Sequence, residues 1–596
     1  MALQDSVPPP LPGLRFRWMF WLLAGLANAA VFLPPYLSNF GNTHFFPHST
    51  LEGASIGPWL SLFTRNNLDM FRISGEWLLL VSILLLIRRR PRLRSWWVAA
   101  ASASFFVLLL YQTYFAVYVK LYGEHPMLIS DLVLAWQVLP IYLGQITGGF
   151  WWMPLTAAGV LLLGSAVWLL MRTLSRLAGN LHLRWPVWAM LGLCWAFVAV
   201  SAWKNQRSVY RYDYHTSQWT SYLIAQSLRG GSLSKFEDLK GRTIYADYPN
   251  LPLEAKPDVY LLFVESYGRC AQTKWWSKDR YARLVQGLTD TLSMAGWNSA
   301  SAYSLAPVLG GRSWLAFTSV MAGVKLDDQI QFNALLDRYP DFPHIIRYFQ
   351  GQGYHTFRLK TFARQEASTD QAYAAQERFY GFDRWMKHHE IPYQGFPYDF
   401  NGGIPDQYGL GYARETAQAA GKPLMMFFIS MGSHWPWFPP APVTADWRQL
   451  DSIREDPYRI PADPRAASEY ERYMARLEEK IYLRYLRTIE YELRMFVDFV
   501  LNTQNPNSVF LIMGDHQPPE ITYYGGDGLE TPVHLISRDT ALIGSLLPYG
   551  FRRGLEADTT LPAPLKHEGL YSLMMRELLR QYGAEDRLPT YLPDGI

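Results

Sequence analysis

The chain has 596 residues, more than one ordinary domain holds, so the sequence predicts several parts. Hydrophobic residues make up 49% and charged residues 18%, which is a low charged share for a soluble protein. The mean hydropathy of -0.07 is nevertheless too polar for a chain embedded entirely in a membrane. The net charge of +4 argues against a dedicated nucleic-acid-binding protein, and two cysteines exclude a disulfide framework and a cysteine-rich zinc site.

The N-terminal third predicts a membrane domain at residues 1–203, because a helix needs about 20 apolar residues to cross a bilayer. Arginines gather at 88–94 and at 172–184, and each cluster lies between two apolar runs. By the positive-inside rule these loops and the N-terminus are cytoplasmic, and the chain after about residue 204 lies outside. Five apolar runs account for the crossings, at roughly 16–34, 71–87, 96–118, 150–171 and 185–203.

Two segments do not fit the pattern of crossings. Residues 126–148 are apolar but contain Asp131 and Pro140, and a sixth crossing there would break the charge rule. We therefore expect an interfacial helix on the outer surface. Residues 204–256 are polar and aromatic and predict a linker with helical pieces, with its flexible point at Arg229–Ser232.

From residue 257 to 596 the pattern changes to short β-rich runs that alternate with amphipathic helices. Strands that are apolar throughout are typical of a parallel sheet covered on both faces, so the pattern predicts an extracytoplasmic α/β domain with a mostly parallel central sheet. The predicted strands are Asp258–Val264, Tyr354–Leu359, Leu424–Ser430 and Ser508–Met513; the predicted helices are Phe342–Gln350 and Ala467–Leu501, the latter as one long helix or two.

Polar residues follow three of the predicted strands. Glu265 follows the first strand, His434 comes shortly after Leu424–Ser430, and Asp515 and His516 follow Ser508–Met513. Each alone is also explained by helix capping or by a hydrogen bond in the core. In open α/β sheets, however, ligands bind beyond the carboxyl ends of the strands. Two carboxylates with imidazole can hold a divalent cation such as Mn²⁺, Zn²⁺ or Mg²⁺, so the coincidence favours a metal site.

The segment Gly310–Trp314 (GGRSW) precedes the apolar run WLAFTSVMA, which ends at Gly323. This pattern predicts a tight loop, a helix that starts at Ser313 and a glycine C-cap. Serine is a common N-cap, which is the structural explanation. The functional explanation is a nucleophile at a helix N-terminus, where free N–H groups favour an alkoxide and a bound phosphate.

In this order, the segments VES, GGRSW, SMGSHWPW and MGDHQPP resemble the alkaline phosphatase/sulfatase superfamily. With the N-terminal apolar runs, the chain is similar to the membrane-anchored branch that includes lipoteichoic acid synthase, glucan phosphoglycerol transferases and lipid A phosphoethanolamine transferases. The specific motifs lie between about residues 258 and 520. The resemblance implies a sulfatase/alkaline-phosphatase-like fold for the outer domain.

The resemblance also implies roles for individual residues. One divalent metal ion (Mn, Zn or Mg) would be held by Glu265, Ser313, Asp515 and His516. Ser313 would be the nucleophile, and His434 would contact the phosphoryl group and protonate the leaving oxygen. Further substrate-side positions are Arg312, Arg364 and Asp406, of which Arg364 also reads as a surface charge.

One departure from the family concerns the nucleophile. The lipoteichoic acid synthase type has a Thr followed by a Ser, and counted back from Phe317 the Thr position is Arg312 and the next is Ser313. Either the loop shifts by one residue and Ser313 attacks, or the chain has lost the nucleophile. Arg312 would also serve as a phosphate clamp. The sequence has no Cys/Ser-x-Pro-x-Arg motif, which argues against sulfate-ester hydrolysis.

The sequence therefore predicts a metal-dependent transferase in a bacterial inner membrane, with its catalytic domain on the periplasmic side. It would move a phospho-head group, phosphoglycerol or phosphoethanolamine, from a membrane phospholipid to an envelope glycan or lipid through a phospho-enzyme. Nucleic acid is not an expected partner. Two alternatives are a phosphodiesterase or sulfatase-like hydrolase, in which water replaces the acceptor, and a non-catalytic membrane partner in envelope polysaccharide assembly.

Overall fold

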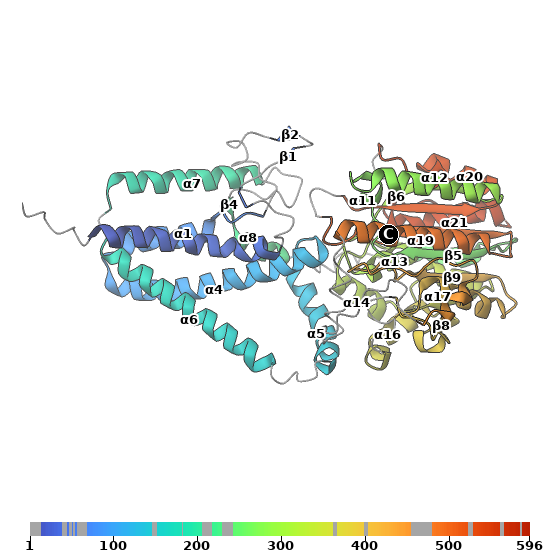
Figure 1. Cartoon of the computed structure of the whole chain (residues 1–596), viewed down its shortest axis with the longest axis horizontal. Helices are drawn as coiled ribbons and strands as arrows, with labels where there is room; N and C mark the ends of the chain where they lie inside the picture. Colours follow the sequence, from blue (N-terminus) through green and yellow to red (C-terminus); the bar gives the residue numbers. More distant parts are fainter. Residues whose placement is uncertain are drawn as a thin grey trace, which may run out of the picture. The chain divides into compact units, whose positions relative to one another are not determined.

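The chain forms two compact units. One comprises Met1–Lys120, His125–Ile129 and Tyr142–Gly230; the other comprises Leu121–Glu124, Ser130–Ile141 and Gly231–Ile596 (Figure 1). The predicted domain boundaries at 203/204 and 256/257 stay predictions. The computed structural model describes residues 13–38, 45–46, 50–51, 54–55, 68–145, 152–181, 183–205, 217–228, 242–361, 366–398, 403–454, 480–522, 528–560, 565–584 and 587–596.

The N-terminal unit is built mainly from long apolar helices at the five predicted runs. Tryptophan indole N–H groups link these helices: Trp77 Nε1 donates to Ala24 O at 2.8 Å, and Trp97 Nε1 donates to Leu80 O at 2.9 Å. These helices are α1 (Gly13–Ser38), α3 (Gly75–Ile87), α4 (Pro91–Tyr122), α6 (Trp152–Gly179) and α7 (Trp185–Asn205).

Three stretches of the described residues are long and apolar enough to cross a membrane: Trp18–Ser38, Pro91–Tyr122 and Pro154–Gly179. Gly75–Ile87 and Trp185–Val200 are apolar but shorter. The five crossings and their orientation therefore stay predictions. A helix also forms within residues 126–148, as α5 (Leu128–Gln145), and its interfacial position stays a prediction.

Short elements complete the chain up to the central sheet. They are β1 (Thr50–Leu51), β2 (Ala54–Ser55), β3 (Ile73–Ser74), β4 (Ser217–Gln218), α8 (Thr220–Ser227), α10 (Arg242–Ala246) and η2 (Tyr248–Asn250). Of these, α8, α10 and η2 are helical pieces within the predicted linker. Its predicted flexible point, Arg229–Ser232, lies outside the described residues.

A nine-stranded sheet organises the C-terminal unit, in the order β12-β6-β11-β10-β5-β9-β7-β8, with β13 paired to β6. The run from β10 to β8 is parallel, whereas β11 pairs antiparallel with both β10 and β6. The strands are β5 (Asp258–Val264), β6 (Asn298–Leu305), β7 (His355–Leu359), β8 (Arg384–Met386), β9 (Leu424–Ile429), β10 (Ser508–Gly514), β11 (Glu530–Ser537), β12 (Arg552–Arg553) and β13 (Leu565–Lys566).

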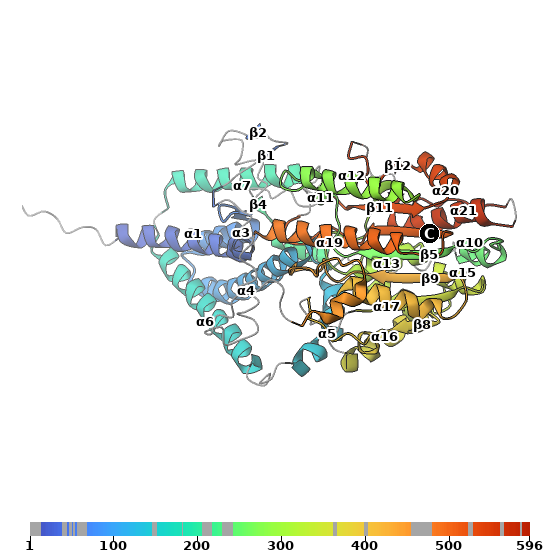
Figure 2. The ribbon, with the colours of Figure 1, turned by 45° about the vertical axis from the view of Figure 1, so that its right-hand side comes forward.

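Helices cover both faces of this sheet (Figure 2). Along β5, Val259, Leu261 and Phe263 enter one core, and the alternate residues from Tyr260 to Val264 enter the other. The first core is covered by α13 (Ser313–Ala322), α14 (Gln329–Arg338), α15 (Ile345–Gly351), α20 (Thr540–Ser545) and α21 (Leu570–Tyr582); the second by α11 (Cys270–Thr273), α12 (Lys278–Met294), α17 (Asp406–Gln418) and α19 (Ile481–Leu501). The remaining elements are α16 (Glu366–Tyr380), η3 (His388–Glu390), η4 (Trp447–Ser452), η5 (Leu547–Tyr549) and η6 (His567–Gly569).

The predicted α/β fold with a mostly parallel sheet is confirmed. β5, β9 and β10 begin where their apolar runs begin. The helix predicted from Phe342 begins only at Ile345, because Phe342 precedes a proline and such residues avoid helical backbone. Of the stretch predicted as one helix or two, Ile481–Leu501 forms α19, and residues 467–479 lie outside the described residues.

Candidate metal and nucleophile site

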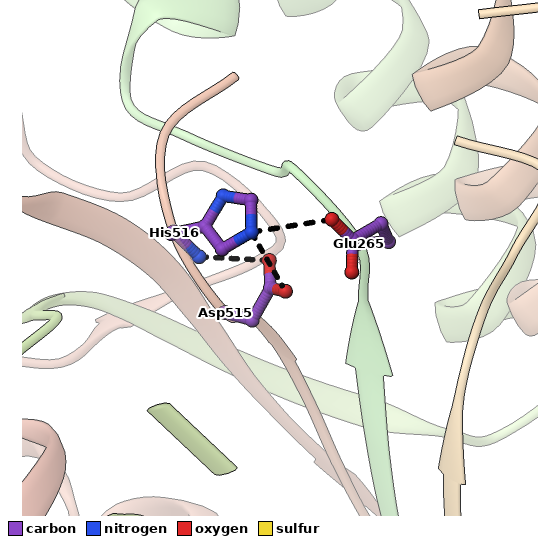
Figure 3. A group of neighbouring side chains, drawn as sticks. All are labelled: Glu265, Asp515 and His516. Carbon is purple, nitrogen blue, oxygen red and sulfur yellow. Dashed lines mark hydrogen bonds and ion pairs between the residues drawn. The ribbon is translucent and has the colours of Figure 1, made fainter. Parts of the chain in front are cut away.

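The central group of the site stands where two neighbouring parallel strands end. Val264, the last residue of β5, is aligned with Gly514, the last residue of β10, so Glu265 and Asp515 follow side by side. His516 Nε2 lies 3.2 Å from Glu265 Oε1 and 3.3 Å from Asp515 Oδ2 (Figure 3). One potential ligand atom from each residue lies within 4.8 Å of the others, and all three side chains are buried.

Backbone and side-chain hydrogen bonds from neighbouring residues fix the two carboxylates. Asp515 Oδ1 accepts from Ser266 N at 2.8 Å and from His516 N at 2.7 Å. Glu265 Oε1 accepts from Ser266 Oγ at 3.2 Å. Ser266 has a φ of 59°, which is uncommon for a non-glycine residue, and this turn brings its N–H onto Asp515. The backbone of the turn after β5 thus orients Asp515, the candidate ligand that follows β10.

Each charged group here changes the pKa of its neighbours. Burial would raise the pKa of Glu265, but the charge of His516 and its hydrogen bond outweigh burial and hold that pKa below its usual range. Burial and the neighbouring Glu265 raise the pKa of Asp515 well above its usual range. For His516, burial would lower the pKa, but the two carboxylates raise it to about 9. A cation within the group would relieve the repulsion between the carboxylates.

The residues present fit a divalent cation. Asp515 Oδ2 is buried and accepts no hydrogen bond from the described residues; its contact with His516 Nε2, at 3.3 Å, is an ion pair, so this oxygen is available to a cation. His516 Nδ1 lies 2.8 Å from Gln517 O, so an N–H at Nδ1 would leave Nε2 with a free lone pair toward the carboxylates. Two carboxylates with one imidazole suit Mn²⁺, Zn²⁺ or Mg²⁺.

Ser313 joins this group from α13. Its Oγ donates to Glu265 Oε2 at 2.7 Å and lies 3.3 Å from His516 Nε2. Ser313 is the first residue of α13, so its backbone N–H belongs to the first helical turn, whose N–H groups have no partner within the helix. The helix begins at Ser313 and ends at the αL C-cap Gly323, as the sequence predicts. Ser313 is not the N-cap, which is Arg312.

The two predicted substrate-side arginines have different outcomes. Arg312 is buried, and its guanidinium forms an ion pair with Glu124, a residue that the sequence analysis does not single out. The hydroxyl of its neighbour Ser313 contacts Glu265, so Ser313 and not Arg312 faces the carboxylates, and its role as nucleophile stays a prediction. Arg364 lies outside the described residues.

His434 is exposed in the turn after β9, and its Nδ1 lies 2.5 Å from Trp435 O. A positive charge on this imidazole would lower the pKa of Glu265. Asp406, the first residue of α17, bonds the backbone of the same turn: its Oδ2 accepts from Met431 N at 2.8 Å and from Gly432 N at 2.6 Å. We call Met431–His434 the histidine turn, and the buried Asp406 supports it through these two hydrogen bonds.

Two buried residues missing from the sequence analysis support this region. Ser430 Oγ accepts from Glu265 N at 3.2 Å, and Glu492 of α19 lies against the turn. A Cβ on Gly432 would lie 2.7 Å from Glu492 Oε1 and 3.2 Å from Asp406 Oδ2, so only glycine permits this close approach. The stretch Thr488–Val500 contains three acids, and Glu492 alone of these is fully buried, a signal visible only once the buried face of α19 is known.

Residues 325–532 match the family model described as Sulfatase. This stretch includes Asp406, His434, Asp515 and His516, whereas Glu265 and Ser313 precede it. The matched residues lie in the C-terminal unit, whose α/β domain is therefore sulfatase-like. No curated protein matches the sequence of the chain.

Three solved structures illustrate what the fold is similar to. The integral membrane protein lipooligosaccharide phosphoethanolamine transferase A from Neisseria meningitidis is 13% identical, with a TM-score of 0.43 over 94% of this chain and 95% of that chain. Lipoteichoic acid synthase LtaP from Listeria monocytogenes is 15% identical, with a TM-score of 0.35 over 60% of this chain and 80% of that chain. Streptococcus pyogenes phosphoglycerol transferase GacH, in complex with sn-glycerol-1-phosphate, is 13% identical, with a TM-score of 0.32 over 56% of this chain and 79% of that chain. These values are too low to transfer a substrate or a residue role.

Proposed function

We propose that this protein is a metal-dependent transferase that moves a phospho-head group from a membrane phospholipid to an envelope glycan or lipid. The donor head group would be phosphoglycerol or phosphoethanolamine. The enzyme would work in the inner membrane of a bacterium, with the C-terminal unit on the periplasmic side. One divalent ion would be held by Glu265, Ser313, Asp515 and His516.

The observation that carries this proposal is the position of the Ser313 hydroxyl. It lies 2.7 Å from Glu265 Oε2 and 3.3 Å from His516 Nε2, at the first turn of a helix. A hydroxyl bound to a carboxylate can pass on its proton, and the open amides of the helix start favour the anionic phosphate that it would attack. The sulfatase-family match and the apolar helices support the same class of enzyme and a lipid-borne donor.

Two balanced steps account for transfer. In the first, Ser313 Oγ forms a bond to the phosphorus and loses its proton to Glu265, while the bond from phosphorus to the diacylglycerol oxygen breaks and that oxygen takes a proton from His434. In the second, an acceptor hydroxyl forms a bond to phosphorus, gives its proton to His434, and the Ser313 ester breaks and regains its proton. A bound metal would supply Lewis-acid stabilisation of the phosphoryl oxygens.

The alternatives differ in what reacts with the phospho-serine. A phosphodiesterase would use water in the second step, and a non-catalytic partner would form no ester. The geometry at Ser313 favours an enzyme over a non-catalytic protein, because the hydroxyl contacts two of the three potential ligand residues, Glu265 and His516.

Product analysis with labelled lipid tests the proposal. Full-length protein would receive phosphatidylglycerol or phosphatidylethanolamine labelled in the head group, together with an envelope fraction and Mn²⁺, Zn²⁺ or Mg²⁺. We expect diacylglycerol to form and the label to move to the acceptor. Free labelled phospho-head group would support the hydrolase instead. No diacylglycerol from either lipid would contradict both enzymatic readings.

The matched variants are Ser313→Ala and Ser293→Ala, the latter at an exposed serine on α12. Ser313→Ala should lower turnover more than about a thousandfold, because the covalent step loses its nucleophile. Ser313→Thr should retain part of the activity, because the hydroxyl survives. Ser293→Ala should match the wild type. Near-normal turnover of Ser313→Ala would show that Ser313 is not the nucleophile.

A further inference from the structure

The last residue of α4 and the residues that follow it contact the loop that carries Ser313. We call Leu309–Ser313 the nucleophile loop. Within the C-terminal unit, the buried Glu124 carboxylate bonds both ends of this loop: Oε1 accepts from Leu309 N, and Oε2 accepts from Arg312 Nη2. A single side chain thus closes the loop immediately before Ser313.

Tyr122 packs on the same loop. Its ring centroid lies 5.3 Å from the guanidinium carbon of Arg312. A Cβ on Gly310 would lie 3.0 Å from Tyr122 O, and a Cβ on Gly311 would lie 3.0 Å from the Tyr122 ring. Both glycines therefore permit a close approach that larger residues would disturb. The glycine pair that the sequence analysis assigned only to a tight turn also forms a contact surface.

The nucleophile loop needs such support because its backbone is strained. Gly311 has a φ of +63°, and Arg312, a non-glycine residue, has φ 58° and ψ 41°. A left-handed conformation at a residue with a long side chain persists only when its surroundings hold it. Glu124 and Tyr122 hold the Arg312 side chain by an ion pair and a cation–π contact. Ser313 comes directly after this residue.

A second contact extends the support to α14. Ser130 Oγ accepts from Gln329 N at 2.9 Å, and Gln329 Oε1 accepts from Trp314 Nε1 at 2.8 Å. Trp314 is the neighbour of Ser313 on its other side. Residues after the candidate span Pro91–Tyr122 therefore reach both flanks of the nucleophile.

We propose that Glu124 is a positioning residue, which holds the nucleophile loop so that the Ser313 hydroxyl stays against Glu265 and His516. The proposal rests on the proposed function in taking Ser313 as the nucleophile. It assigns Arg312 to Glu124 and not to the substrate phosphate. It also makes the activity of the outer domain depend on residues that the chain places directly after α4.

A double-mutant cycle on the full-length protein tests the proposal, with labelled phosphatidylglycerol and phosphatidylethanolamine as probes. Glu124→Ala and Arg312→Ala should each lower kcat by about 10- to 100-fold, because a small displacement of the nucleophile costs that much, while KM changes little. The double variant should be no slower than the slower single variant, because both changes break the same contact. Glu124→Gln keeps an acceptor for Leu309 N and should recover part of the loss.

The matched control is Asp258→Asn. Asp258 is also a buried carboxylate that accepts from a backbone amide, Leu424 N at 2.8 Å, but it lies at the opposite end of β5. This variant should keep wild-type kcat. If the losses of kcat in Glu124→Ala and Arg312→Ala multiply in the double variant, and Arg312→Ala raises KM both with and without Glu124, then Arg312 binds the substrate. This result would overturn the proposal. Unchanged kcat in Glu124→Ala and Glu124→Gln would also overturn it.

Amide hydrogen exchange separates failure of this proposal from failure of the proposed function. Exchange in peptides covering residues 309–313 should speed up in Glu124→Ala and Arg312→Ala but not in Asp258→Asn. If the wild type transfers neither head group yet exchange responds in this way, the positioning contact stands and the proposed function fails. Wild-type exchange of this loop in Glu124→Ala would overturn the positioning role whatever the activity.

Discussion

Asp515 and His516 illustrate how side chains predicted from strand ends meet in the folded chain. The prediction needed only that β5 and β10 are parallel and that polar residues follow them. The same reasoning could not find Glu124 or Ser430, because each acts through the tertiary fold: Glu124 lies 185 residues from its backbone partner Leu309, and Ser430 lies 165 residues from Glu265. Neither belongs to a local motif.

Loss of a ligand should remove the metal. Asp515→Ala or His516→Ala deletes one of three buried ligand side chains, together with a charge or a lone pair, so we expect metal binding to fall from close to one ion per chain to near zero. Metal analysis of full-length protein after dialysis measures this. The buried histidine His344, which contacts Phe379 O, offers a control, since His344→Ala should keep the metal. Full metal content in both ligand variants would contradict the site.

At the scale of elements, continuous apolar runs made strands β5, β9 and β10 predictable from the sequence, whereas strands β6 and β11 were not predicted. The β6 sequence, NSASAYSL, is short of apolar residues because it buries serines that hydrogen-bond to histidines: Ser301 Oγ lies 2.7 Å from His534 Nδ1, and Ser304 Oγ lies 2.9 Å from His567 Nδ1. Buried polar groups satisfied by partners from distant elements leave no hydrophobic pattern in the sequence.

The contact between α19 and the histidine turn predicts a pH-dependent stability. Burial and the charge of Asp406 raise the pKa of Glu492 well above its usual range, so the folded protein favours the protonated acid. That stabilisation is fully present below the unfolded pKa of about 4.3 and is lost as pH rises toward the folded pKa, at about 1.4 kcal/mol per pH unit. Glu492→Gln should therefore gain stability relative to the wild type as pH rises.

Thermal unfolding of both proteins across this pH range provides the measurement. The melting temperature of the wild type should fall relative to that of Glu492→Gln with rising pH. Glu415→Gln is the control, because its carboxylate is 50% exposed and should show no such divergence. Parallel curves for the wild type and Glu492→Gln would mean that Glu492 is charged in the folded protein.

At the scale of the whole molecule, the sequence predicts a membrane part followed by an outer domain, and the described residues contain three helices long and apolar enough to span a bilayer. The two shorter apolar helices, Gly75–Ile87 and Trp185–Val200, decide whether the number of crossings is odd. Reporter fusions after residue 90 should behave as cytoplasmic, and fusions after residue 210 as external. A cytoplasmic reporter at 210 would contradict the five-span prediction.

Mass spectrometry of full-length protein incubated with donor lipid and without acceptor tests the covalent role of Ser313 most directly. If Ser313 accepts the head group, its peptide should gain the mass of phosphoglycerol or phosphoethanolamine, matching the head group supplied. The adduct should be absent from Ser313→Ala and should disappear when acceptor is added. Turnover of donor lipid with the adduct on another residue, or with an unmodified Ser313 peptide in trapped samples, would contradict a phospho-enzyme at Ser313.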